Sequence, residues 1–151
     1  MKELALPPGE RRLAWAVTEQ GDPVVATDGA LLLPGADRLP WEQVERVGWQ
    51  RPRMTVLEVA ELEGSGTRHV LELADAGDLP EIVWSRVTAS VAWSTHSRLA
   101  PAGGVRVVGR RVEGEETLRW QLVYDRGTQL QDPLVRAQAE QLLDGARRTI
   151  G

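Results

Sequence analysis

The sequence predicts an α+β fold of short antiparallel strands, with one internal helix, a three-stranded meander and a closing helix. Three observations indicate this class. Short apolar runs alternate with turn residues over the first half of the chain, apolar residues recur at helical spacing over 79–89 and again after 133, and period-two alternation occupies 91–124 between them. We expect one continuous domain over residues 1–151.

The first half is expected to contain six strands joined by tight turns. An Asp28-Gly29 pair between apolar runs is the strongest short hairpin signal in the chain. A short helical turn is predicted at Trp41, and a hairpin turn is predicted at 64–66. The predicted strands are centred on residues 13–17, 24–27, 31–33, 44–49, 54–59 and 70–73.

Both helices have start signals. Asp78, followed three positions later by Glu81, resembles a capping box that opens a helix over 79–89. Asp132-Pro133 combines an N-cap residue with proline at the first helical position, which predicts a closing helix that ends near residues 147–148. The only candidate boundary between parts of the chain lies near 89–90, where the first helix gives way to the meander.

Composition excludes several classes of protein. The chain has 151 residues, no cysteine and a net charge of −4, so disulfides, thiolate metal sites and a cysteine nucleophile are excluded. An acidic chain is a poor nucleic-acid ligand. No apolar run approaches the ~18 residues of a membrane span, and the first nine residues do not resemble a signal peptide. We therefore expect a cytoplasmic protein that binds neither nucleic acid nor membranes stably.

The two histidines, His69 and His96, do not predict catalysis. Neither is accompanied by a nucleophile and a carboxylate at the spacing of a known hydrolase family. A zinc site would have to rely on carboxylate ligands, because histidine is scarce and cysteine is missing. The sequence is thus expected to hold no metal or cofactor and to be no enzyme, with His69 satisfied by a local partner.

Two short motifs resemble the bacterial pleckstrin-homology-like and GRAM-like group. They are Val25-Ala26-Thr27-Asp28-Gly29-Ala30-Leu31 and Pro40-Trp41-Glu42-Gln43-Val44. The resemblance covers about residues 10–90 and implies a partly open, antiparallel β-barrel closed by a helix, although that fold has seven strands before its helix. Residues 91–150 form an additional meander and helix. The resemblance implies a binding or scaffold role without naming a ligand.

Six tryptophans and no phenylalanine give the chain an unusual aromatic composition. Trp15, Trp93 and Trp120 lie in phase with apolar neighbours, so we expect them in the core. Trp49 and Trp84 are less clearly inward-facing and are the candidate contact aromatics, because an exposed tryptophan indicates a contact surface.

The meander presents a candidate surface. If its apolar residues point to the core, period two places a histidine and four arginines on the opposite face. This face has two interpretations: an ordinary solvated sheet face with cross-strand acidic partners, or a site for an anion or an acidic partner, which guanidinium groups can bind bidentately. The residues are His96, Arg98, Arg106, Arg110 and Arg119.

Two functions follow as hypotheses. The first is a non-enzymatic interaction or scaffold module that binds a protein partner or a second copy of itself. The alternative is a binder of small molecules or anionic headgroups, or an enzyme, that uses a basic pocket. The sequence leaves both open.

Overall fold

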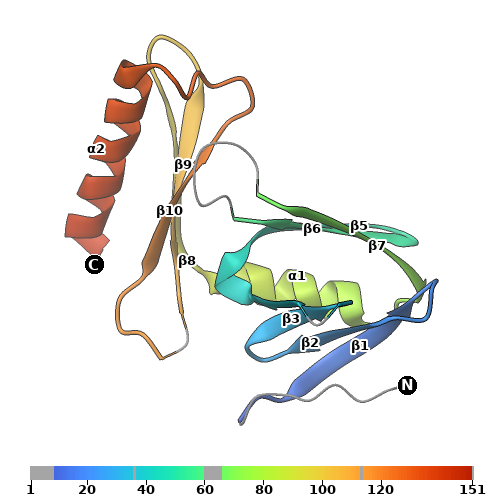
Figure 1. Cartoon of the computed structure of the whole chain (residues 1–151). Helices are drawn as coiled ribbons and strands as arrows, with labels where there is room; N and C mark the ends of the chain where they lie inside the picture. Colours follow the sequence, from blue (N-terminus) through green and yellow to red (C-terminus); the bar gives the residue numbers. More distant parts are fainter. Residues whose placement is uncertain (1–8, 36, 60–65, 113, 151) are drawn as a thin grey trace. The chain divides into compact units, whose positions relative to one another are not determined.

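The computed structural model of the chain describes residues 9–35, 37–59, 66–112 and 114–150. It divides into two compact units, Met1–Ala89 and Ser90–Gly151. This division coincides with the boundary near 89–90 that the sequence indicates. The α+β class and the antiparallel pairing are confirmed (Figure 1), whereas the expectation of one continuous domain stays a prediction.

The first unit contains an antiparallel sheet of seven strands with the order β4-β3-β2-β1-β7-β6-β5. In the described residues β4 and β5 are the two edges and do not pair, so the sheet is not a closed barrel. A 3-10 turn, η1 (Trp41–Gln43), connects these two strands. The strands are β1 (Arg12–Thr18), β2 (Pro23–Thr27), β3 (Ala30–Leu33), β4 (Asp37–Pro40), β5 (Val44–Gln50), β6 (Arg53–Glu58) and β7 (Arg68–Asp75).

The expected count of six strands before the first helix is wrong, because β4 was missed. This strand has only four residues, of which Asp37 and Arg38 are exposed, so it carries no apolar alternation. It forms because β3 offers it a partner, with Leu31 opposite Leu39. The other strands and the turn at Trp41 are confirmed, and most of the hairpin turn predicted at 64–66 lies outside the described residues.

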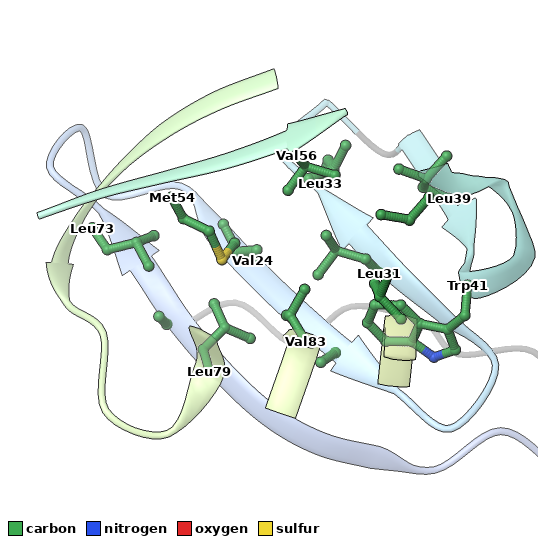
Figure 2. Packing of buried hydrophobic residues seen from close by; sticks show 14 residues of the cluster. Val24, Leu31, Leu33, Leu39, Trp41, Met54, Val56, Leu73, Leu79 and Val83 are labelled. Atoms are coloured by element: carbon green, nitrogen blue, oxygen red, sulfur yellow. The ribbon is translucent and has the colours of Figure 1, made fainter. Parts of the chain in front are cut away.

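The core of the first unit lies between this sheet and helix α1 (Leu79–Ser90), as Figure 2 shows. Leu79, Val83 and Val87 recur at helical spacing and are buried against the strands, which confirms the predicted helix. Trp41 is 5% exposed and belongs to the same cluster.

The expected burial of Trp15 is wrong, since 47% of this residue is exposed. In β1 the small residues Ala14 and Ala16 face the core, and alternation then directs Trp15 to the opposite face of the sheet.

The second unit contains the predicted meander and closing helix. Strands β8 (Val91–Arg98), β9 (Gly104–Arg110) and β10 (Arg119–Tyr124) form a sheet with the order β10-β9-β8, and α2 (Pro133–Ile150) lies along one face of it (Figure 1). Val135 and Ala139 of α2 are completely buried against Val105 of the central strand. The cap is confirmed, because Asp132 Oδ1 accepts a hydrogen bond from the Leu134 N–H at 2.9 Å.

Gly109 makes room for an aromatic pair in this sheet. It lies opposite Trp93 on one neighbouring strand and opposite Trp120 on the other. The two indole rings meet edge to face, with centroids 5.8 Å apart and planes at 62°. A Cβ on Gly109 would approach the Trp120 ring and Leu118 to 3.0 Å. Both tryptophans lie on the face that carries Val105 and Val107, which confirms their expected inward direction, but they are only half-buried and do not belong to the buried core as expected.

Candidate interaction surface

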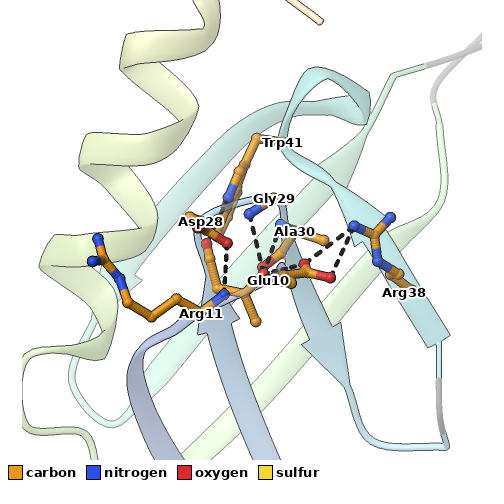
Figure 3. Close-up of polar contacts among 8 residues, drawn as sticks. Glu10, Arg11, Asp28, Gly29, Ala30, Arg38 and Trp41 are labelled. Carbon is orange, nitrogen blue, oxygen red and sulfur yellow. Dashed lines mark hydrogen bonds and ion pairs between the residues drawn. The ribbon is translucent and has the colours of Figure 1, made fainter. Parts of the chain in front are cut away.

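Residues of the two motif segments form a hydrogen-bond network around the β2–β3 turn and η1 (Figure 3). The Thr27 hydroxyl accepts hydrogen bonds from the N–H groups of Gly29 and Ala30, at 3.2 and 3.0 Å, and so closes the β2–β3 turn. Trp41 Nε1–H donates to the Thr27 carbonyl oxygen at 2.9 Å. The motif residues Thr27 and Trp41 therefore stabilise the turn and fasten η1 to it.

Glu10 completes this network from the start of the chain. Its carboxylate accepts a hydrogen bond from the Thr27 hydroxyl and forms an ion pair with Arg38, in which Nη2 lies 3.1 Å from Oε1. The Glu10 side chain is only 6% exposed. Asp28 Oδ1 meanwhile accepts the Arg11 N–H at 2.9 Å. The Glu10 carboxylate, the Thr27 hydroxyl and Asp28 Oδ1 each have a partner within the chain, so the network is structural rather than a binding site.

The predicted division of the meander residues between the two faces of the sheet is confirmed. His96 lies opposite Arg106, and Arg98 lies opposite Gly104. Alternation places these side chains on the face opposite to the one that α2 covers. His96, Arg98 and Arg106 are all exposed. We call these three residues the basic cluster, because directly opposite and diagonal positions on paired strands lie about 4.5–8 Å apart.

Arg110 lies on the predicted outward face but is buried there, so its expected place on the exposed surface is wrong. The residue is 3% exposed, and its Nη1 donates to Ser90 Oγ at 2.6 Å. Its neighbour on the same face, Val108, is also buried at 3%. Alternation along β9 predicted the correct face of the sheet for Arg110, but the residues on this face are buried at the Val108–Arg110 end of the strand.

Arg119 lies outside the basic cluster as well. It is opposite Arg110, four positions along β9 from Arg106, which corresponds to about 13 Å. Its Nη2 forms an ion pair with Glu115 at 3.1 Å, and both side chains are nearly half exposed. For Arg119 the ordinary interpretation therefore holds, since it is a solvated side chain with an acidic partner.

Asp125, an acidic residue that the sequence did not indicate, contacts the basic cluster. Asp125 follows β10, and its Oδ2 lies 2.7 Å from His96 Nε2. The two side chains meet beside Gly104, where an added Cβ would overlap the Asp125 carboxylate and lie 2.9 Å from His96 Nε2. The available signal in the sequence was the pair Gly103-Gly104 between the first two strands of the meander. Glycine is required here for space.

Arg98 and Arg106 differ from the other charged residues of this face. Arg106 Nη1 donates to the Ser94 hydroxyl at 3.0 Å and forms no ion pair with a described carboxylate. Arg98 has no polar side-chain partner within the described part of the chain. Acidic partners from outside the strands, Asp125 and Glu115, thus account for His96 and Arg119 but not for these two guanidinium groups.

The remaining candidates lie in the first unit. His69 Nε2 is 2.6 Å from Glu58 Oε2, which confirms a locally satisfied histidine. Trp49 is 38% exposed at the sheet edge in β5, and Trp84 is 59% exposed on α1. Among the residues with described positions, no three His, Asp or Glu side chains are grouped to hold a metal ion.

Comparison of the chain with protein-family models, with curated proteins and with solved structures gives no match. Neither helix, within the described residues, combines the length and the apolar composition needed to cross a membrane.

Proposed function

We propose that the chain is a non-enzymatic interaction module whose basic cluster binds an acidic segment of a protein partner. The observation that carries this proposal is the pair Arg98 and Arg106, exposed on neighbouring strands without a carboxylate partner among the described residues. Guanidinium groups bind carboxylates through planar, paired hydrogen bonds, so two of them suit an acidic segment. His96, opposite Arg106 and two residues from Arg98 on β8, adds a third polar side chain.

We also propose a pleckstrin-homology-like architecture for the first unit, in a cytoplasmic protein. Its described residues form seven antiparallel strands followed by one helix, which is the element count that this fold has. The motif contacts support the proposal, because Trp41 is bonded to Thr27 and both belong to the matching segments. On this proposal the first unit is a scaffold, and the meander is the addition that carries the binding surface.

Anisotropy of a fluorescein-labelled octa-glutamate peptide tests the binding proposal directly. The double variant Arg98→Glu, Arg106→Glu removes both guanidinium groups, and the wild-type chain is the reference. A hydrogen bond to a charged group contributes roughly 1.5–3 kcal/mol, so losing even one should weaken binding by at least about tenfold. Because both positions are exposed, the variant should unfold at the same denaturant concentration as wild type.

Arg12→Glu, Arg46→Glu is the matched control. These arginines are also exposed on strands, but in the first unit, and the change in net charge is identical. Equal weakening by the control would mean that only net charge matters, which contradicts a local site. If inorganic phosphate binds wild type but not the Arg98 and Arg106 variant, while octa-glutamate binds neither, the small-anion alternative replaces the partner proposal.

A further inference from the structure

The seven-stranded sheet has an opening in its middle, between β1 and β7. The ladder that joins these two strands contains only two residue pairs, Val17 with Asp75 and Thr18 with Leu73. The first half of β7 extends past the β1–β2 turn, and no strand among the described residues pairs with it on that side. A hollow of about 490 Å³ lies at this position, lined by Thr18, Gln20, Asp22, Pro34, Val70, Leu71 and Glu72.

Main-chain groups of β7 face this opening. The Leu73 N–H donates to the Pro52 carbonyl and so points toward β6, whereas the Glu72 carbonyl accepts the Glu19 N–H on the β1 side. Because both main-chain groups of a residue in an antiparallel strand point the same way and alternate along it, those of Val70 and Arg68 also point to the β1 side. Within the described residues no strand pairs with them there.

Val70 is unusual for a residue in an interior strand. It is 51% exposed, and it lines the hollow that its main chain faces. Open strand edges are templates for pairing with another chain, and they are normally blunted by charge, proline or a covering element. At this edge the apolar Val70 is exposed between Arg68 and Glu72, which alternation places on the same face of β7.

The charges around the hollow specify its occupant. Asp22 forms no ion pair with any described residue, and Glu72 contacts only the exposed Arg53, at 3.5 Å. Two carboxylates and the Gln20 amide surround the opening, so a cationic side chain is favoured there. We propose that the β7 edge binds a short extended segment of a partner protein, which adds as a strand beside Arg68 and Val70 and places a lysine or arginine in the hollow.

This site is separate from the basic cluster, lies in the other unit and selects the opposite charge. The test uses the full chain labelled with ¹⁵N and the peptide acetyl-Thr-Val-Lys-Val-Thr-amide. At saturating peptide the amide resonances of Val70 and Arg68 should shift, and hydrogen exchange of the Val70 N–H should slow at least about tenfold, because a hydrogen-bonded amide exchanges only after opening. The same peptide with glutamate in place of lysine should bind at least about tenfold more weakly.

Matched variants separate the site from a general charge effect. Asp22→Asn should weaken binding of the lysine peptide several-fold, whereas Asp37→Asn, which removes the same charge from β4, should not. An unchanged exchange rate at Val70, equal binding of the glutamate peptide, or equal weakening by Asp37→Asn would overturn the proposal. Shifts of the Val70 and Arg68 amides that grow with protein concentration without peptide would assign the edge to a second copy and also overturn it.

Discussion

Replacing Gly109 with alanine should destabilise the second unit, although alanine is normally the better residue in a strand. The new Cβ would lie 3.0 Å from two atoms of the Trp120 ring and from Leu118 Cδ1. Overpacking of this kind typically costs 1–3 kcal/mol. Alanine also restricts the unfolded chain, which stabilises the folded state by about 0.4–1 kcal/mol. The difference between these ranges is a net loss of about 0–2.6 kcal/mol, with a central value of about 1.3 kcal/mol.

The aromatic pair provides the assay. Trp93 and Trp120 meet edge to face at 5.8 Å, so the exciton couplet of their strong far-UV indole bands in circular dichroism reports on packing around Gly109. Urea unfolding followed through this signal should give a lower midpoint for Gly109→Ala, and the native signal itself should decrease. Following the pair, rather than all six tryptophans, keeps the measurement within the second unit.

Gly48→Ala is the matched control, since Gly48 is also a strand glycine but has open space around its added Cβ. Because Gly48 lies in β5 of the first unit, unfolding of this variant is followed by the fluorescence of all the tryptophans. Only the effect on the unfolded chain remains there, and we expect a gain of about 0.4–1 kcal/mol. If Gly109→Ala were as stable as wild type with an unchanged aromatic signal, the argument from space around Gly109 would be wrong. An equal loss in Gly48→Ala would point to a general intolerance of alanine in these strands.

Three further predictions follow from single contacts and from charge. Trp41→Phe should lower the free energy of unfolding by about 1–3 kcal/mol in a urea titration, because it leaves the buried Thr27 carbonyl without its indole donor; an unchanged midpoint would contradict the role of this bond. Asp132→Ala should cost about 0.5–2 kcal/mol by removing the cap from Leu134 N–H, while Asp132→Asn should retain most of it. Vesicles rich in anionic lipid should not co-sediment the chain at physiological salt, because its net charge is −4; co-sedimentation would favour the headgroup alternative.

Local sequence periodicity was sufficient to predict the meander and both helices. In β8, period two separates Trp93 from His96 and so assigns each to its face. In α2, the Asp132-Pro133 start and the 3.6-residue spacing of Val135 and Ala139 define the helix and its buried side. Such patterns predict helices and strands from the sequence because every residue of the element contributes to its periodicity.

Periodicity does not reveal which face of a strand the core occupies. Leu13, Trp15 and Val17 were in phase, but the small residues Ala14 and Ala16 face the core, so the tryptophan is exposed. For Arg110 the face was predicted correctly and its burial was not, because burial depends on what covers that end of the sheet. Both errors arise from tertiary packing, which outweighs local pattern.

The local pattern of the sequence also could not predict the pairing of His96 with Asp125. The two residues are 29 positions apart, and they lie on either side of β9 rather than on adjacent strands. They can meet over the central strand because Gly104, which lies between them, has no side chain. A glycine that joins two strands resembles an ordinary turn residue, so the sequence favoured the simpler interpretation.

Asp125 should weaken the binding proposed for the basic cluster, because its carboxylate already pairs with His96 and repels the carboxylates of the ligand. Asp125→Asn keeps the shape and removes the charge, so octa-glutamate should bind more tightly. Both His96 and Asp125 are about 40% exposed, at 39% and 44%, which limits the effect to that of a solvated ion pair. Roughly 0.2–1 kcal/mol corresponds to a gain of about 1.5-fold to fivefold in anisotropy titrations. Asp144→Asn, with the same change in charge on α2, is the control and should have a smaller effect. Weaker binding by Asp125→Asn would show that the carboxylate positions His96 for the ligand instead of competing with it.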